Sequence, residues 1–486
     1  MKNMKLANKD ANRDLILNGN MYRAIFSIAV PVMINSFLQT MYNLVDTYWL
    51  GQIGTKQLAA INLVSPVQNI IINFGNGITV AGSVLIAQFI GAGLKKDAKS
   101  MANQIFKCAM IFALCCAAVC FVLTGGIVSW LGASGETAHH AEVYLRTVIW
   151  DMPFLFMVNI FSAVHQAQGD TVRPMFLNFG GICLNMLLDP LFMIVLGWNT
   201  FGAAIATVLA KAVPATIAFI LLLNRNNAVC LDRSYMHIEK EKLKTILSIG
   251  LPTAIGGSTM QLGFLLMSRN VYVYGDAAMA AYGIGNKVNS LITLPVTGVG
   301  SSVATIVGQN TGARKLDRAE LGYRLSMRMS MAFLFVGGMI LSRPFISTAI
   351  VSIFSKEPEV VGMAADFLSI MAFWCFTNGI YNTTSGLFQG TGHTEVTMTI
   401  DATRLWVFRF LTLWFCGSIL HMGVRSVWYS VVVSNGISAV ILYVLYRTGL
   451  WRKPRIKIEG KDEEKQLKDK KTDNNGYRSN ALHRTA

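Results

Sequence analysis

Two carboxylates stand inside stretches of sequence that are otherwise apolar enough to lie in lipid. Asp46 belongs to the apolar run 21–50, and Asp189 belongs to the run 171–196. A charge at the bilayer centre costs about 2.5–3.5 kcal/mol on the most lenient scale, so such residues rarely lack a function. Asn185 precedes Asp189 by one helical turn, and the two side chains therefore share a helix face. Carboxylates and an amide on facing helices can take up a proton or surround Na⁺ with oxygen atoms.

The expected depths of these groups agree with one common site. At 1.5 Å per residue, Asp46 lies roughly 6 Å below the outer end of its span, and Asp189 lies about 10 Å below its own. Thr207 lies about 10 Å from the start of the run 200–223. We therefore predict a cation-coupling site formed by Asp46, Asn185, Asp189 and Thr207. The competing interpretation is a structural ion pair or an acid that reaches the interface.

Further polar residues lie on the faces that this site would use. Gln39 and Asn43 precede Asp46 at i, i+4, i+7 spacing, so the three form one polar stripe along the helix. Asn159 and Ser162 are three residues apart and adjoin on one face. Lining a cavity and hydrogen bonding between helices are equally open for that pair. We assign all four neutral residues to a substrate cavity.

Four charged residues within the membrane are expected to form ion pairs. Lys211 lies too deep to reach the interface easily, and its partner is either Asp151 or Asp189. Lys287 and Asp366 come at similar depths in the second half of the chain, where we predict a structural ion pair. A buried ion needs a partner of opposite charge, because its desolvation is costly.

The composition identifies a polytopic membrane protein. Hydrophobic residues make up 53% of the 486 residues and charged residues only 14%, and the mean hydropathy is +0.46. The formal net charge is +16, but the basic residues gather in loops and in the C-terminal tail. This distribution follows the positive-inside rule and excludes nucleic acid as the expected partner. The eight cysteines show no metal-binding spacing.

Apolar runs separated by polar breaks predict an all-α fold with about twelve transmembrane helices. Each basic loop falls on one side of the membrane if both termini are cytoplasmic, so we predict that orientation in the cell (plasma or inner) membrane. A cleavable signal peptide is not expected, because the first apolar run is long enough to span. The predicted spans are 21–50, 58–91, 101–130, 140–168, 171–196, 200–223, 243–272, 277–309, 320–345, 358–390, 395–418 and 424–447.

The two halves of the chain repeat each other. The segment ending at Pro31 recurs at Pro252, a displacement of 252 − 31 = 221. The Gln-x-x-Gly pattern at Gln88 recurs at Gln309 with the same displacement, and Gln166 corresponds to Gln389 with 223. We therefore predict two six-helix bundles related by a pseudo-two-fold axis along the membrane normal.

The repeat divides the chain and separates its charges. We predict a polar N-terminal segment (1–20), a first lobe (21–223), a cytoplasmic linker (224–242), a second lobe (243–450) and a disordered cytoplasmic tail (451–486). With these displacements Asp46 corresponds to Met267 and Asp189 to Thr412, so the acidic pair is confined to the first lobe. Arg404 and Arg409 are expected to face the interior of the second lobe or its cytoplasmic rim.

An enzyme is the competing class of function. It would need a nucleophile with a base, or a metal cluster, at matched depth, and the sequence offers neither. The Gly-rich Lys-Ser/Thr motif for ATP phosphates is also missing from the sequence. We expect no enzymatic activity, no metal and no cofactor other than H⁺ or Na⁺ as the coupling ion.

The chain resembles the multidrug and toxic compound extrusion (MATE) transporters from about Met21 to Leu450. The most specific features are Val45-Asp46-Thr47 with Gly51, the run from Asn185 to Pro190, and the run from Gly202 to Thr207. The resemblance implies two six-helix bundles around a V-shaped cavity and export of drugs in exchange for H⁺ or Na⁺.

Particular positions match the DinF-like prokaryotic branch of that family. By this resemblance Asp46, Asn185, Asp189 and Thr207 correspond to its ion site. Gln39 and Asn159 resemble positions that line the drug cavity, and Pro31 resembles the proline that bends the first helix. The expected function is a secondary antiporter for amphipathic or cationic compounds, working as a monomer among membrane lipids. The alternative is a flippase for lipids or lipid-linked oligosaccharides from the same wider group.

Overall fold

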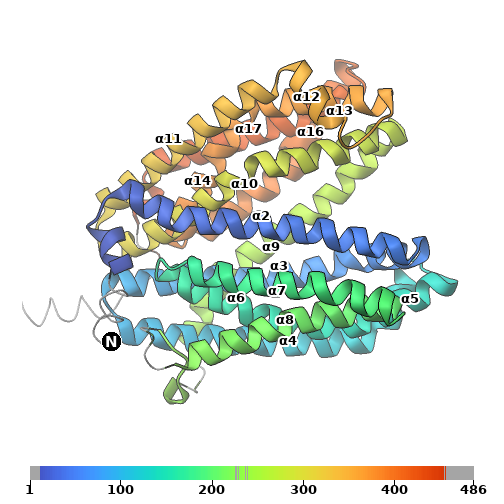
Figure 1. The fold of residues 1–486 in the computed structure, drawn as a ribbon. Helices are drawn as coiled ribbons and strands as arrows, with labels where there is room; N and C mark the ends of the chain where they lie inside the picture. Colours follow the sequence, from blue (N-terminus) through green and yellow to red (C-terminus); the bar gives the residue numbers. More distant parts are fainter. Residues whose placement is uncertain are drawn as a thin grey trace, which may run out of the picture.

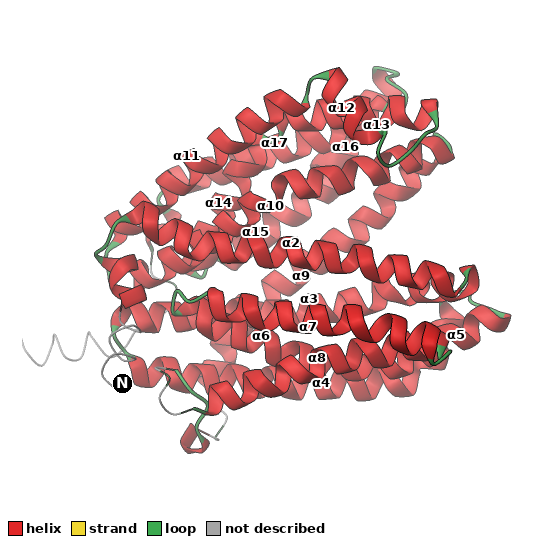
Figure 2. Cartoon of the chain, in the orientation of Figure 1, coloured by secondary structure: helices red, strands yellow, loops and turns green. Residues whose placement is uncertain are grey.

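The computed structural model describes residues 11–224, 227, 229–235, 237, 239–453 and 455. Throughout these residues the regular structure is helical, with no strand (Figure 2). Helices satisfy their own backbone hydrogen bonds, which is the condition for crossing lipid. Beyond residue 455, the predicted disordered tail lies outside the described residues.

The first half of the chain forms one group of helices (Figure 1). A short helical turn over 11–17 precedes the first long helix, for which the Asn20 side chain is the N-cap. The elements are α2 (Met21–Ile53), α3 (Thr55–Ala92), α4 (Lys95–Trp130), α5 (Gly135–Val148), the 3₁₀ turn η1 (Ile149–Asp151), α6 (Met152–Ala167), α7 (Val172–Pro190), the π-helix η2 (Leu191–Val195) and α8 (Asn199–Leu223).

The second half forms the other group, joined to the first through the 3₁₀ turn η3 (Arg233–Tyr235). Its elements are α9 (Lys240–Tyr272), α10 (Asp276–Gly312), α11 (Leu316–Leu341), α12 (Pro344–Val351), α13 (Pro358–Trp374), α14 (Phe376–Thr391), α15 (Thr394–Thr403), the π-helix η4 (Arg404–Arg409), α16 (Phe410–Trp414), the π-helix η5 (Phe415–Ile419), α17 (Arg425–Arg447) and the 3₁₀ turn η6 (Leu450–Arg452).

These elements account for the predicted twelve spans. In the described part of the chain, ten helices are long and apolar enough to cross a membrane, and the pair α13 and α14, bent by 54°, makes an eleventh. The run from α15 to η5 continues without a break over 394–419 and makes the twelfth. The prediction of an all-α membrane protein with about twelve helices is therefore confirmed.

The two lobes meet through equivalent helices. α2 packs along α10, and α3 packs along α9. A Cβ atom on Gly91 of α3 would lie 1.9 Å from the carbonyl oxygen of Gln309, and one on Gly312 of α10 would lie 1.9 Å from that of Gln88. The repeat displacement of 221 relates these two contacts, so the glycines allow the same close backbone approach twice.

Hydrogen bonds across the interface repeat in the same way. Gln88 donates from Nε2 to the carbonyl oxygen of Gly390 over 2.9 Å, and Gln309 donates to that of Ala167 over 2.7 Å. Each glutamine reaches the end of the fourth span of the opposite lobe. The sequence repeat is thus also a pseudo-two-fold relation of contacts.

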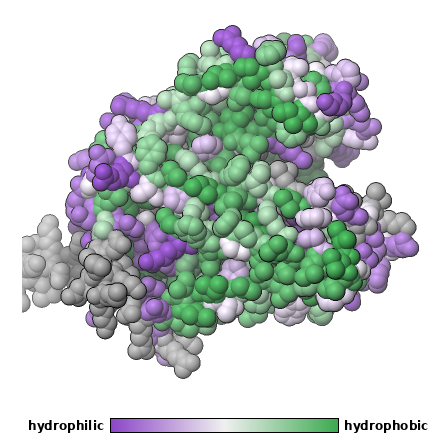
Figure 3. Space-filling view, in the orientation of Figure 1, coloured by the Kyte–Doolittle hydropathy of each residue, from purple (hydrophilic) through white to green (hydrophobic). Residues whose placement is uncertain are grey.

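The lobes diverge away from the chain's N-terminal end. Figure 1 shows α2 to α8 and α9 to α17 separating toward the end opposite the N-terminus, and the space-filling view is hollowed there (Figure 3). At the joined end, Arg13 donates to the carbonyl oxygen of Ile90, and Arg318 donates to that of Ile16, over 2.8 and 2.9 Å. The described part of the predicted N-terminal segment is therefore bound to both lobes.

Candidate functional site

The predicted acidic pair comes together inside the first lobe. The side chains of Asp46 on α2 and Asp189 on α7 lie close enough to interact electrostatically. Asp189 is 1% exposed, and its Oδ1 accepts a hydrogen bond from Asn185 Nδ2 over 3.2 Å. Two carboxylates this close repel each other unless one of them takes up a proton or a cation lies beside them. The arrangement is therefore suited to hold a proton, or a cation in its place.

Local structure explains how α7 presents these groups. Asn185 and Asp189 occupy the last turns of α7, and Pro190 precedes the π-helix η2, where the helix is locally widened. Asp189 Oδ2 and Asn185 Oδ1 are buried and accept no hydrogen bond from an N–H or O–H group. Buried polar atoms without donors are rare and call for an explanation. A bound cation would satisfy both oxygens.

A cavity of about 210 Å³ lies beside the pair, between α2, α6, α7 and α8. Asn185, Thr207, Gln39 and Asn159 line it, as four of the sequence predictions require. The Thr207 hydroxyl donates to the carbonyl oxygen of Ala203 over 3.0 Å and keeps its oxygen lone pairs for another partner. The cavity therefore joins predicted ion-site residues to predicted substrate-cavity residues.

Lys211 also lines this cavity, and its partner is Asp151. The ammonium group donates to Asp151 Oδ2, and Asp151 is 2% exposed. Of the two partners left open by the sequence, the structure thus selects Asp151. Because Lys211 and Asn185 line the same cavity, the ion pair lies beside the acidic pair.

A second cavity of about 400 Å³ lies where the lobes meet. Asn159 and Ser162 line it from the first lobe, while Asn382, Ser385 and Gln389 line it from the second. Its polar side chains are amides and hydroxyls. Such groups can hydrogen-bond to many solutes in either direction.

Two predictions are not supported by the geometry. Asn43 is exposed and lines neither of these two cavities. The predicted ion pair between Lys287 and Asp366 is wrong, because Asp366 accepts two hydrogen bonds from Arg425, over 2.8 and 3.0 Å. Arg425 is the first residue of α17 and Asp366 lies midway along α13, and depth read from the sequence does not choose between basic partners.

Pro31 leaves α2 continuous. The helical assignment runs from Met21 to Ile53 through the proline, so the missing N–H group does not interrupt the helix. The hinge at Pro31 remains a prediction.

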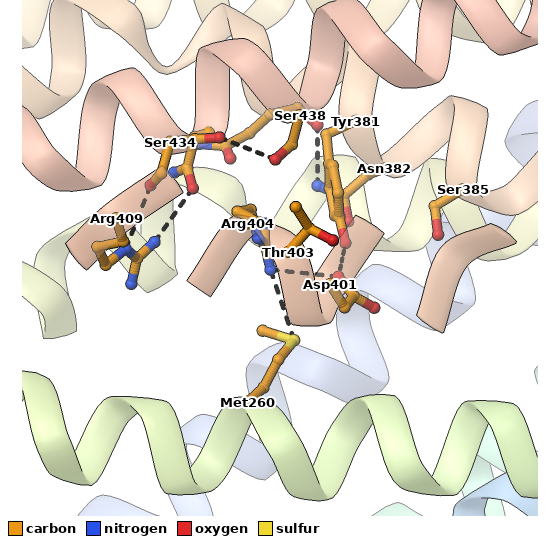
Figure 4. A network of polar contacts seen from close by, with 12 residues as sticks. Met260, Tyr381, Asn382, Ser385, Asp401, Thr403, Arg404, Arg409, Ser434 and Ser438 are labelled. Carbon is orange, nitrogen blue, oxygen red and sulfur yellow. Dashed lines mark hydrogen bonds and ion pairs between the residues drawn. The ribbon is translucent and has the colours of Figure 1, made fainter. Parts of the chain in front are cut away.

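The sequence predicted that Arg404 and Arg409 face the interior of the second lobe or its rim, and both are buried, but it did not predict the polar residues around them. Figure 4 shows Asp401 beside Tyr381 and Arg404, with Arg404 extending toward Met260 of α9. Arg409 donates to Ser434 and Asn435, both over 3.2 Å. The signal in the sequence was two arginines five residues apart within an apolar run. The guanidinium carbon of Arg404 lies 4.3 Å from the centre of the Tyr381 ring, and that of Arg409 lies 5.8 Å from the centre of the Phe264 ring.

The linker between the lobes is held against α4. Lys99 forms an ion pair with Asp232 over 2.8 Å, and Gln104 donates to the carbonyl oxygen of His237 over 2.6 Å. The Lys99 ammonium and the hydrogen bonds from Ser234 hold the pKa of Asp232 well below its usual range. Asp232 is therefore charged at neutral pH.

Comparison with known proteins identifies the family. The sequence model of the MatE family matches residues 31–191 and 252–415. The probable multidrug resistance protein YoeA of Bacillus subtilis is 23% identical over 446 residues, which cover 90% of this chain and 96% of that protein. The probable multidrug resistance protein NorM of Thermotoga maritima is 24% identical over 439 residues, covering 89% and 93%.

Solved structures share the fold. An outward-facing multidrug resistance MATE family transporter of the MOP superfamily superimposes with a TM-score of 0.84 at 24% identity, covering 89% of this chain and 96% of that one. A MATE structure in the bent conformation gives 0.84 at 24% identity, covering 90% and 97%. With the family model matching most of both lobes, the chain belongs to the MatE family, the MATE transporters that its sequence resembles.

Proposed function

We propose that this protein is a secondary antiporter that exports amphipathic, often cationic compounds in exchange for a cation. The observation that carries the proposal is the close approach of Asp46 to Asp189 inside the first lobe, beside a cavity and with Asp189 Oδ2 lacking a hydrogen-bond donor. The names of relatives, such as the multidrug export protein MepA of Staphylococcus aureus (24% identical over 374 residues), support export of several compounds.

The coupling ion is proposed to be a proton, because two carboxyl groups in contact repel each other unless one is protonated. Loss of that proton leaves two negative charges side by side, which favours a different arrangement of α2 and α7. The ion shifts the equilibrium between conformations only by its different affinity for each of them. Na⁺ at the same oxygens is the alternative.

The cavity between the lobes is the proposed substrate path. Its neutral amides and hydroxyls select no single charge. A flippase for a pyrophosphate-linked lipid would need a more basic cavity. The charged group in the two cavities is Lys211, whose charge is offset by Asp151.

We further propose that the protein acts as a monomer in the cell membrane, among membrane lipids, with both termini cytoplasmic. The basic residues at the joined end of the lobes, including Arg13, Lys99, Lys315 and Arg318, support this orientation. We also propose that the protein belongs to the DinF-like branch of the family.

The test is dye efflux from proteoliposomes with pH and Na⁺ gradients imposed one at a time. We expect Asp46→Asn and Asp189→Asn to abolish gradient-driven exchange, while Asp366→Asn, which removes an acid paired with Arg425, retains it. An elution profile in detergent matching the wild type establishes that each variant is folded. Normal exchange by both first-lobe variants would overturn the proposal, and dependence on Na⁺ alone would replace the proton.

A further inference from the structure

The polar cluster of the second lobe stands at the place that the ion-site cavity occupies in the first. The repeat displacement rises to 415 − 191 = 224 at the π-helices η2 and η5. Residues with positive φ confirm it, since Gly197 corresponds to His421 and Asn199 to Gly423. The displacement is still 223 at Thr171 and Thr394, which donate to Ile28 and Ile249. The π-helix η4, between these points, therefore supplies one extra residue.

This register changes which residues correspond between the lobes. Arg409 takes the place of Asn185, because 409 − 185 = 224, and Asp189 corresponds to Leu413 rather than to Thr412. The second lobe thus has no acid at the positions that correspond to Asn185 and Asp189. At the position of Asn185 it carries an arginine, Arg409.

The remaining members of the cluster correspond to residues that line the first-lobe cavity. Met260 corresponds to Gln39 with a displacement of 221, and Asp401 corresponds to Asn178 with 223. Asn435, which accepts from Arg409, corresponds to Lys211 with 224. Where one lobe carries an ionisable residue at these positions, the other lobe therefore carries a neutral one.

The charges of the cluster do not cancel. Arg404 is paired with Asp401, whereas the partners of Arg409 are the neutral side chains of Ser434 and Asn435. Arg409 is 3% exposed and Arg404 is 8% exposed. Nη1 of Arg409 and Nε of Arg404 are buried donors without an acceptor. The cluster therefore has a net charge of one positive unit and N–H groups ready to donate.

We propose that Arg409 and Arg404 form a binding site for the carboxylate group of an amphipathic substrate. A guanidinium group matches the planar geometry of a carboxylate and bonds it in a bidentate manner. The single excess charge suits one carboxylate better than a pyrophosphate, and Phe264 and Tyr381 provide aromatic surface beside the arginines. The inference rests on the proposed function and specifies that zwitterionic compounds are among its substrates.

The alternative is that Arg409 only fastens η4 to α17 through Ser434 and Asn435. A neutral glutamine would preserve much of that hydrogen bonding without the charge. The structural role and the binding role therefore differ in how Arg409→Gln affects two ligands that differ only in a carboxylate.

The experiment measures dye binding to the purified protein in phosphatidylcholine nanodiscs by fluorescence anisotropy. The probes are a rhodamine dye with a free benzoate group and the methyl ester of the same dye. We expect the wild type to bind the acid about tenfold more tightly than the ester, as a charge-assisted bidentate contact requires. Arg409→Gln should abolish this preference and leave ester binding unchanged, whereas Arg409→Lys should retain part of it.

Arg425→Gln is the matched control, because it removes the same charge from an arginine whose side chain is 60% exposed. Equal affinities of the two dyes for the wild type would overturn the inference, and this comparison needs no variant to fold. So would a preference that survives in Arg409→Gln, or a loss of both dyes together. If the preference for the acid dye is lost in phosphatidylglycerol nanodiscs, the site binds a lipid headgroup, and the proposal that it binds a substrate carboxylate is overturned.

The outcome separates the inference from the proposed function. Gradient-driven efflux of the ester dye tests the antiporter alone. Efflux of the ester without a preference for the acid would refute the carboxylate site and leave the antiporter standing. A preference for the acid that depends on Arg409, without gradient-driven transport of either dye, would refute the antiporter and leave the carboxylate site standing.

Discussion

The ion pair between Lys211 and Asp151 allows the electrostatics of the first lobe to be tested quantitatively. Asp151 is 2% exposed at η1, and the Lys211 side chain is 29% exposed in the cavity. Oδ1 of Asp151 has no donor, so Lys211 supplies the positive charge that this buried carboxylate needs. Lys211→Met removes that charge while keeping an unbranched side chain of similar length.

The expected cost follows from this burial. Removing one partner of a buried ion pair costs about 3–5 kcal/mol, because the other charge is left without compensation. We expect Lys211→Met to lower the free energy of unfolding by about 3 kcal/mol, the lower end of this range, because the lysine side chain is 29% exposed. In the double variant with Asp151→Asn no charge remains at either position, so its loss should fall short of the sum of the single losses by on the order of 2–3 kcal/mol.

The assay is unfolding of the purified variants in detergent, followed by tryptophan fluorescence. The Arg425–Asp366 pair provides a matched cycle, because its two side chains are 60% and 30% exposed. An exposed pair of this kind contributes about 0.2–1 kcal/mol. The reasoning would be refuted if the losses in free energy of unfolding of the two single variants simply added in the Lys211–Asp151 double variant. It would also be refuted if the interaction energy of this pair were no larger than that of the Arg425–Asp366 pair.

Two further predictions concern the joints of the molecule. Gly91→Ala and Gly312→Ala should each destabilise the lobe interface by about 1–3 kcal/mol, because the added methyl group meets a carbonyl oxygen of the other lobe; equal thermal stability to the wild type would contradict this. Asp232→Asn should speed proteolysis of the linker at neutral pH. Because the pKa of Asp232 is lowered by Lys99, the wild-type linker should stay protected at pH 7 and also at pH 4, losing protection only as the pH falls through the lowered pKa. Faster cleavage of the wild type already at pH 4 would show that the ion pair does not hold the linker.

The parts of the fold that depend on hydrophobic runs were predictable from the sequence. Length and apolarity define the spans, and the repeated glycines and glutamines reveal the two lobes. The acidic pair was predictable too. A carboxylate in lipid is costly and therefore marks a functional site, and residues one helical turn apart share a face with it. Each of these inferences uses only local sequence and the thickness of the membrane.

Choices among partners of similar depth were not predictable. Asp366 pairs with Arg425 rather than Lys287, and Lys211 pairs with Asp151 rather than Asp189. Depth along a helix axis is read from residue number, but rotation and neighbour identity depend on tertiary packing. The N-terminal segment, bound to both lobes through Arg13 and Arg318, also depends on such contacts.

The register of the second lobe illustrates the limit most clearly. One extra residue in η4 turns the helix so that Arg409, not Phe408, takes the position of Asn185. A constant displacement of 223 hides this, because a π-helix leaves no signature in apolar periodicity.

The two lobes thus place different chemistry at equivalent positions on either side of the proposed substrate path. Under the proposed antiport, the first lobe becomes more negative when its cation leaves, whereas the second lobe keeps one excess positive charge. A zwitterionic substrate would find its cationic group favoured by the first lobe only after the ion has gone, whereas its carboxylate would be held by Arg409 in either state. Coupling would then act on one end of the substrate alone. The exchanged ion would thus weaken binding of the acid dye and of its ester by the same factor.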